Sequence, residues 1–182
     1  ELDDFVSLTA SGIFYTKLDQ GDFVKTIIIG GDALDVITFS DKRALRFSAK
    51  EIPLVRRSAR GVRSIGGKTV EYVDGMTLVA GKDITDVVVV TKNGYLNRFN
   101  INALPQSQRA KAGSSVVKLS KTDRINSINI VNQNDSIRLT TENGMTDIKV
   151  SELPTGSSIS AGTKCISGKD TVLKAMIVKI VK

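Results

Sequence analysis

The sequence predicts an all-β fold of propeller-like blades, because three kinds of residue recur together along the chain. The prolines are spaced 52 and 49 residues apart, at Pro53, Pro105 and Pro154. A glycine follows each proline by eight residues, at Gly61, Gly113 and Gly162. An apolar residue precedes each proline by six residues, at Phe47, Phe99 and Ile148. A period of about fifty residues is typical of arrays of similar modules, which present extended surfaces rather than one deep catalytic cleft.

The repeat divides the chain into four units, which we expect to form a single domain. Their approximate bounds are residues 1–31, 32–81, 82–132 and 133–182, and the first unit is abbreviated. Each complete unit holds about four short apolar runs rich in β-branched residues, without a helical period. Four-stranded units in tandem favour propeller blades over an ordinary β-sandwich, whose spacing would agree only by accident. With about four blade units, we expect an open or spiral arrangement, or a fragment of a larger ring.

Each complete unit opens with a predicted β-hairpin, at residues 32–53, 83–105 and 134–154. Asn93-Gly94 and Asn143-Gly144 are strong hairpin patterns, because type I′ turns need positive φ at both central residues. The aligned turn of the second unit, Asp41-Lys42, has no glycine and predicts a longer or different loop.

Two further strands are predicted after the glycine of each unit. They lie at 62–65 and 76–80, at 114–119 and 125–131, and at 163–166 and 172–178. In the first unit, residues 5–18 match the opening hairpin and residues 22–29 match the last strand, with only Asp19, Gln20 and Gly21 between them. Either this unit lacks the loop or the sequence omits a segment, and the residues leave both readings open.

The residues that are absent exclude most catalytic and metal chemistry. The 182 residues include no histidine and one cysteine, Cys165, which removes the commonest general base and any Cys/His zinc cluster. No Gly-rich phosphate loop opens a helix, so we predict no catalytic residue, metal or cofactor in this chain. One cysteine indicates a reducing compartment, and we expect Cys165 to be a small buried side chain. Neither a signal peptide nor a membrane span is visible, so we expect a cytoplasmic protein.

The formal net charge is +7, and the basic residues concentrate in one window. Between Asp41 and Lys68, nine basic residues face two acidic ones, so the remainder of the chain is neutral. Most of the nine are arginines, which form bidentate contacts with phosphate. The loops from proline to glycine carry three basic residues in 53–61, two in 105–113 and none in 154–162.

Arg57 and Arg109 occupy the same repeat position, four residues after a proline. Because equivalent loops of successive blades lie along one edge of an array, we expect their arginines to form a curved basic stripe. Such a stripe suits the regular phosphates of duplex DNA, and these loops have no aromatic residue for stacking on single strands. Two alternatives stay open: a solvated basic loop, and a propeller-type scaffold that binds acidic partners.

Several segments resemble the C-terminal domain of bacterial type IIA topoisomerase A subunits, namely the A subunits of DNA gyrase and of topoisomerase IV. Residues 43–65, RALRFSAKEIPLVRRSARGVRSI, resemble one blade of that domain. Residues 87–99, VVVVTKNGYLNRF, resemble the opening hairpin of another blade, and the SxRAKxG pattern at 107–113 resembles a loop. The resemblance extends more weakly through all four units.

The resemblance implies a β-pinwheel, a disc whose blades exchange strands, with duplex DNA wrapped or guided on its basic rim without sequence preference. It implies an accessory part of an ATP-dependent topoisomerase of the bacterial nucleoid. The implied partners are the ATPase B subunit of that enzyme together with the remaining parts of the A subunit. The DNA-cleaving tyrosine, ATP and Mg²⁺ belong to other parts of the enzyme. Tyr15, Tyr72 and Tyr95 are therefore expected to be packing residues, and no membrane or small-molecule substrate is expected.

One family feature is absent. The gyrase box QRRGGKG does not occur, and QRAKAG at 108–113 is a degenerate form of it, which favours topoisomerase IV over gyrase. The shortened stretch Asp19–Gly21 is where the box would belong, so a missing loop would remove the same observation. The predicted DNA-binding residues are Arg43, Arg46, Arg56, Arg57, Arg60, Arg63, Lys68, Arg98, Arg109 and Lys111.

Overall fold

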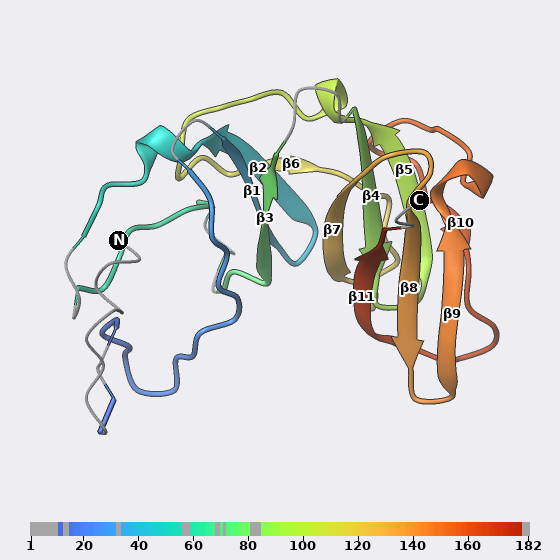
Figure 1. The fold of residues 1–182 in the computed structure, drawn as a ribbon, viewed down its shortest axis with the longest axis horizontal. Helices are drawn as coiled ribbons and strands as arrows, with labels where there is room; N and C mark the ends of the chain where they lie inside the picture. Colours follow the sequence, from blue (N-terminus) through green and yellow to red (C-terminus); the bar gives the residue numbers. More distant parts are fainter. Residues whose placement is uncertain are drawn as a thin grey trace.

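The structure is a computed structural model that describes residues 11–12, 15–31, 34–55, 59–67, 70, 72–80 and 85–179. This part of the chain is all-β and forms three sheets (Figure 1). The first sheet contains β1 (Asp35–Ser40), β2 (Arg43–Ser48), β3 (Gly75–Val79) and β6 (Ser114–Ser115). The second contains β4 (Asp86–Thr91), β5 (Tyr95–Asn100), β7 (Ile125–Val131) and β10 (Thr163–Lys164). The third contains β8 (Ser136–Thr141), β9 (Gly144–Lys149) and β11 (Val172–Val178).

Successive sheets exchange a strand. The first two sheets have the orders β3-β1-β2-β6 and β7-β4-β5-β10. The short strand β6 belongs to the third unit, yet it pairs with β2 so that Ser115 lies opposite Arg43. In the same way β10 of the fourth unit pairs with β5, and Lys164 lies opposite Tyr95. The four-stranded β-pinwheel blade is confirmed in the first two sheets, and the strand after Gly113 or Gly162 completes the blade before its own. Residues 62–65, predicted as a strand after Gly61, form no strand.

A short 3-10 helix follows the second strand of each unit and leads to the proline. These helices are η2 (Ala49–Glu51), η3 (Ile101–Ala103) and η4 (Val150–Glu152). The side chain of Ser48 caps η2, and that of Asn100 caps η3, by accepting a backbone N–H from the residue two places ahead. After η3 and η4 the chain leaves its own blade and crosses to the preceding one.

The repeated glycine is required where the crossing chain meets the preceding blade. Gly113 and Gly162 have φ of +68° and +75°, a region that other residues rarely adopt. A Cβ on Gly113 would lie 2.6 Å from the Ala44 carbonyl oxygen, and one on Gly162 would lie 2.5 Å from that of Leu96. In the third and fourth units, the glycine eight residues after the proline therefore marks the point where two backbones touch, whereas a Cβ on Gly61 would have no atom within 4 Å.

The Asn-Gly pairs do mark hairpins, but the predicted type I′ turns are wrong. Neither Asn93 nor Asn143 has the positive φ that such a turn requires. The Gly94 N–H donates to the Thr91 carbonyl at 3.0 Å, and Gly94 has φ +78°, which is typical of a type I turn followed by a left-handed glycine. Asp41, at φ +49°, lets the β1–β2 turn form without glycine.

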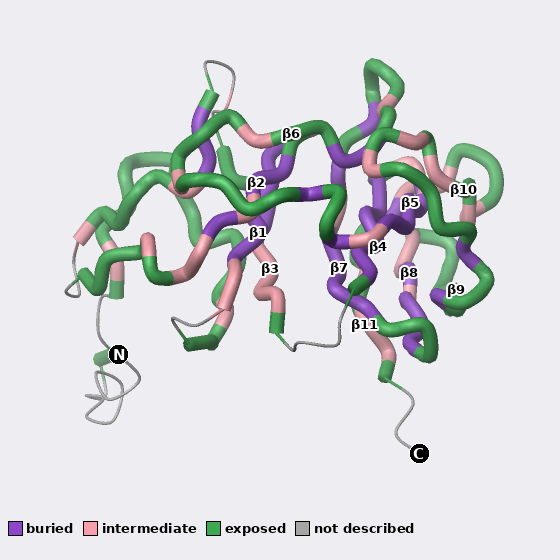
Figure 2. Tube along the Cα trace, turned by 90° about the horizontal axis from the view of Figure 1, so that it is seen from above, coloured by how far each residue is buried: buried purple, intermediate pink, exposed green. Residues whose placement is uncertain are grey.

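The core lies between the sheets and is built mainly from Val, Ile and Leu, as the sequence predicts. Strand β4 is buried on both faces, which explains its continuous run of valines. Val87 and Val89 pack in the cluster that joins the second sheet to the first, whereas Val88 and Val90 pack in the cluster shared with the third. Figure 2 shows the buried residues gathered in the strands, with exposed loops around them.

The first unit differs from its prediction. Most of the predicted hairpin 5–18 lies outside the described residues. Residues 22–29 form no strand, and Phe23 and Ile27 are 60% and 78% exposed. A strand requires a hydrogen-bonded neighbour, and the described part of the chain places none beside this segment.

Candidate nucleic-acid interface

The third-unit loop, residues 105–113, crosses from the second sheet to the edge of the first (Figure 1). Its backbone follows the preceding blade closely. The Ser107 N–H donates to the Arg46 carbonyl at 2.8 Å, and the Ala110 N–H donates to the Ser64 carbonyl at 2.9 Å. The Gly66 N–H donates in turn to the Lys111 carbonyl at 2.8 Å. The basic residues of this loop are thereby placed on the blade formed by the second unit.

Arg109 is half-buried and holds the loop in place. Its backbone N–H donates to the Glu51 carboxylate at 2.8 Å, and its Nε donates to the Glu51 carbonyl at 3.0 Å. Its Nη1 donates to the carbonyl of Arg63. One guanidinium therefore connects the end of η2 to the segment after Gly61, and part of its hydrogen-bonding capacity is used within the protein.

The structure brings four of the predicted basic residues together at this edge. Arg43 on β2 donates from Nη1 to the Gly113 carbonyl at 2.9 Å, and its side chain is exposed. Arg63 and Lys111 are also exposed, and neither forms an ion pair with a described residue. We call the set Arg43, Arg63, Arg109 and Lys111 the first-sheet edge.

Arg60 lies where the second-unit loop meets the first unit. The Lys17 N–H donates to the Ala59 carbonyl at 3.2 Å, and Arg60 forms an exposed ion pair with Asp19 at 2.8 Å. Its charge is partly compensated by Asp19, and water screens what remains.

Three predicted residues, Arg56, Arg57 and Lys68, lie outside the described residues. The predicted alignment of Arg57 with Arg109 therefore stays a prediction.

Arg98 is a correction to the predicted interface, because it lies in the interior at 6% exposure. Its Nε donates to Asp86 at 2.9 Å, and its Nη1 donates to the carbonyls of Val150 and Leu153 at 3.0 and 3.2 Å. The strand turns this side chain inward, so its guanidinium joins the second sheet to η4 of the next unit and cannot face a ligand.

Arg46 repeats this arrangement one unit earlier, although its side chain is partly buried, at 19% exposure, rather than in the interior. Its Nε donates to Asp35 at 2.8 Å, and its Nη1 reaches the Ile101 carbonyl at 3.5 Å. The sequence contained a sign of this role, because each arginine has an aspartate eleven or twelve residues earlier at the start of the first strand. In the fourth unit the place of these arginines is taken by Asp147, which forms an ion pair with Arg138 on the neighbouring strand.

Sequence reasoning also missed a set of aspartates that anchor the hairpin turns. The buried Asp123 accepts N–H bonds from Asn93 and Arg124, both at 2.9 Å. Asp74 accepts the N–H of Asp41 in the same way. Hydrogen bonding from the Thr141 side chain is the main cause of a lowered pKa at Asp170, with Asn143 adding to it. The three positions share one place in the repeat, just before the last strand.

The remaining predictions on chemistry concern cysteine, metals and membranes. Cys165 is half-buried, and desolvation raises the pKa of its thiol. The described part of the chain contains no group of three or more histidine, cysteine, aspartate or glutamate residues placed to hold a metal ion. None of the helices described there is long and apolar enough to cross a membrane.

Comparison with known proteins found a matching family model and several related proteins. Residues 35–74 and 85–132 match the model of the DNA gyrase C-terminal domain, a β-propeller. The DNA gyrase A subunit of Aminobacterium colombiense is 28% identical over 98% of this chain and 22% of its own length. That of Borrelia hermsii is 30% identical over 76% of this chain and 17% of its own length. The DNA topoisomerase 4 A subunit of Staphylococcus epidermidis is 26% identical over 55% of this chain and 12% of its own length.

Two solved structures share the fold. The C-terminal domain of DNA topoisomerase IV superposes with a TM-score of 0.89 at 22% identity, over 98% of this chain and 57% of that one. The C-terminal domain of DNA gyrase A superposes with a TM-score of 0.78 at 21% identity, over 91% of this chain and 57% of that one. Both kinds of enzyme are represented, so the preference for topoisomerase IV stays a prediction. The chain belongs to the β-pinwheel C-terminal domains of type IIA topoisomerase A subunits.

Proposed function

We propose that this domain binds duplex DNA without sequence preference and bends it along its basic edge. The observation that carries the proposal is the first-sheet edge, where residues from two units meet. Arg43 and Arg63 come from the second unit, and Arg109 and Lys111 come from the third. Because the four residues come from two units, they form an extended basic surface, which can contact several phosphates along a duplex.

The side chains at this edge suit backbone contacts better than base recognition. Exposed arginine and lysine neutralise phosphates and release counterions, which gives affinity without sequence information. The loops 53–61 and 105–113 contain no aromatic residue, so the stacking platform typical of single-strand binders is absent from them. Duplex DNA is therefore the nucleic acid that the edge fits best.

The greater length of the relatives supports a role within a larger enzyme. This chain spans about a fifth of the curated gyrase A subunits that it matches. We infer that it serves as an accessory domain of a bacterial type IIA topoisomerase, which acts on nucleoid DNA in the cytoplasm. Its partners there are an ATPase B subunit together with the remaining parts of the A subunit. Strand cleavage and the ATP and Mg²⁺ chemistry are assigned to those other parts, and bent DNA presented by this domain would guide strand passage.

Binding assays at several salt concentrations and DNA lengths test the proposal. If roughly five to seven phosphates are neutralised, log K against log salt should fall with a slope of about −5 to −6. Affinity should rise with duplex length until the DNA reaches round the edge, and then level off. Gel shifts with a series of linear duplexes and a closed circle measure both quantities.

A scaffold for acidic proteins is the competing function, and it predicts a different result. It would bind every duplex weakly, with no preferred length and no preference for a bent or circular form. That outcome would exclude DNA bending as the role of this edge.

A further inference from the structure

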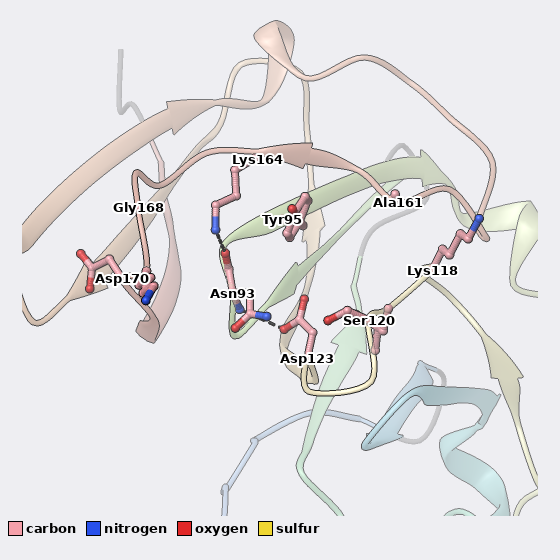
Figure 3. Close-up of a pocket in the computed structure, with 11 residues that line it drawn as sticks. Asn93, Tyr95, Lys118, Ser120, Asp123, Ala161, Lys164, Gly168 and Asp170 are labelled. Atoms are coloured by element: carbon pink, nitrogen blue, oxygen red, sulfur yellow. Dashed lines mark hydrogen bonds between the residues drawn. The ribbon is translucent and has the colours of Figure 1, made fainter.

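A second basic region lies at the edge of the second sheet, where the crossing loop itself has no charge. A cavity of about 600 Å³ opens there (Figure 3). Lys118, Lys164 and Lys169 line it together with Asn93, Tyr95 and Asp123. The walls come from the β4–β5 hairpin, from the segment after β6, and from β10 with the residues that follow it.

Backbone hydrogen bonds fix these walls to one another. The Lys118 N–H donates to the Ser160 carbonyl at 2.9 Å, and the Cys165 N–H donates to the Gly94 carbonyl at 2.9 Å. The first contact repeats the bond between Gly66 and Lys111 at the first-sheet edge. The cavity is therefore a fixed feature of the exchange between blades, at the same place as the first-sheet edge one blade later.

Lys164 is held in the middle of the cavity. Its ammonium donates to the Asn93 carbonyl and lies 5.1 Å from the centre of the Tyr95 ring (Figure 3). An ammonium has three N–H donors and the carbonyl uses one, so the others are available to a ligand. The ring also favours a cation at this place, and the carboxylate of Asp170, on the same cavity, attracts the ammonium electrostatically.

The other two lysines lie toward opposite ends of the cavity. Lys118 lies at one end of the view in Figure 3, and Gly168 and Asp170, which flank Lys169 in the sequence, lie at the other. Both lysines are exposed, and neither forms an ion pair with a residue that the structure describes. Three cations spread along one opening suit an extended polyanion better than a single compact ion.

Two carboxylates also line the cavity, but they are occupied by the protein. Asp123 is 2% exposed and accepts two backbone N–H groups. Asp170 accepts the Thr171 N–H at 2.9 Å, and the hydrogen bonds from Thr141 and Asn143 already described lower its pKa. Together the three lysines and two aspartates give the cavity a net charge of +1, and the three lysines are the exposed residues among them.

We propose that this cavity holds phosphate groups of a DNA strand and so continues the first-sheet edge onto the second sheet. This inference rests on the proposed function. The fourth-unit loop, residues 154–162, has no charged residue. If only the loops from proline to glycine supplied basic residues, the basic edge would therefore end at the first sheet. Two lysines outside that loop restore the charge. Lys118 lies where the second unit has Gly66, and Lys164 lies where the third unit has Ser115 and the second has Arg63.

The double variant Lys118→Gln/Lys169→Gln tests the proposal, because neither side chain takes part in an ion pair with a described residue. The slope of log K against log salt for duplex binding should become shallower by about 2, since each phosphate contact contributes about 0.9. The matched control is Lys174→Gln/Lys179→Gln, which removes the same charge from β11 and the residue after it, outside the cavity. A control slope equal to that of the original protein and a shallower slope for the cavity variant support the proposal. Equal slopes in the two variants overturn it.

A titration with inorganic phosphate separates a DNA strand from a free phosphate ester. The amide NMR signals of Asn93 and Gly168 report occupation of the cavity. Saturation by phosphate alone at micromolar concentration would make the cavity a small-anion site and overturn the strand assignment. Weak, unsaturated shifts that become strong with duplex DNA support it. If the unchanged protein binds no duplex, the proposed function fails, whatever the NMR titration shows. If phosphate also shifts no signal of Asn93 or Gly168, the cavity proposal is overturned as well.

Discussion

Changing Arg63 and Lys111 together to glutamate should weaken duplex binding roughly 100-fold at 0.1 M salt. Both side chains are exposed at the first-sheet edge, and neither is engaged in an ion pair with a described residue. With a slope of about −0.9 per phosphate, two lost contacts account for about two decades of affinity at 0.1 M relative to 1 M salt. Fluorescence anisotropy with a labelled duplex measures the loss, and circular dichroism checks that the variant is folded.

Arg43 and Arg109 are left unchanged in this variant because each also holds the crossing loop through a carbonyl. The control is Lys174→Glu/Lys179→Glu, which makes the same charge change away from the first-sheet edge. A large loss in the edge variant with a small loss in the control would place the contacts at the edge. Equal losses in both would show that the net charge alone, and no particular surface, governs binding.

Replacing Arg98 with methionine should lower the free energy of unfolding by about 3–5 kcal/mol, the cost of removing one partner of a buried ion pair. Asp86 is 8% exposed and would keep its charge without a partner. The carbonyls of Val150 and Leu153 would also lose their donor. Urea unfolding followed by circular dichroism gives the midpoint and the slope, which together give the change in stability.

Two further variants identify the cause of this destabilisation. Arg138→Met breaks the exposed pair with Asp147 and should leave the unfolding midpoint nearly unchanged, because solvent screens such pairs. Arg98→Met/Asp86→Leu removes both buried charges and should recover part of the loss. If Arg98→Met unfolds at the same urea concentration as the unchanged protein, the buried guanidinium does not join the blades as described.

Different basic residues thus stabilise the packing between sheets and supply the charge of the outer edge. Arg98 is buried and Arg46 partly buried, and both bind carbonyls of the following unit, so they help to fix how one sheet sits against the next. Arg43, Arg63 and Lys111 lie outside, on an edge whose course depends on that internal arrangement. A variant in either set should therefore affect DNA bending, but only the internal set should affect stability strongly.

The sequence predicted those features that follow from local patterns. Alternation of apolar residues and the Asn-Gly pairs predicted the hairpins, and the paired prolines and glycines predicted the blades. The turn type could not be predicted in the same way, because an asparagine before a glycine accommodates both a type I′ turn and a type I turn with a left-handed glycine. The choice depends on contacts such as that between Asp123 and the Asn93 N–H, which join residues thirty positions apart.

The site was predicted only in part, for a related reason. A charge count cannot tell a guanidinium on the outer edge from one that bridges two blades, so Arg98 was grouped with Arg63. Alignment of the repeat drew attention to the loops from proline to glycine, whereas Lys118 and Lys164 lie outside them. The position of Lys118 carries no charge in the second and fourth units, and that of Lys164 is Arg63 in the second unit but Ser115 in the third. These lysines come together with Tyr95 and Asn93 only after strand exchange places β10 beside β5.

The central claim is that the basic edge bends duplex DNA, and the most direct measurement is the distance between the ends of a bound duplex. Energy transfer between dyes on the two ends should rise when this domain binds, and it should rise less with Arg63→Glu/Lys111→Glu at matched saturation. Smooth bending of a duplex of about 30 base pairs costs on the order of several kcal/mol, so only contacts distributed along the edge can maintain it. An end-to-end distance that stays that of straight DNA at full saturation would contradict the claim.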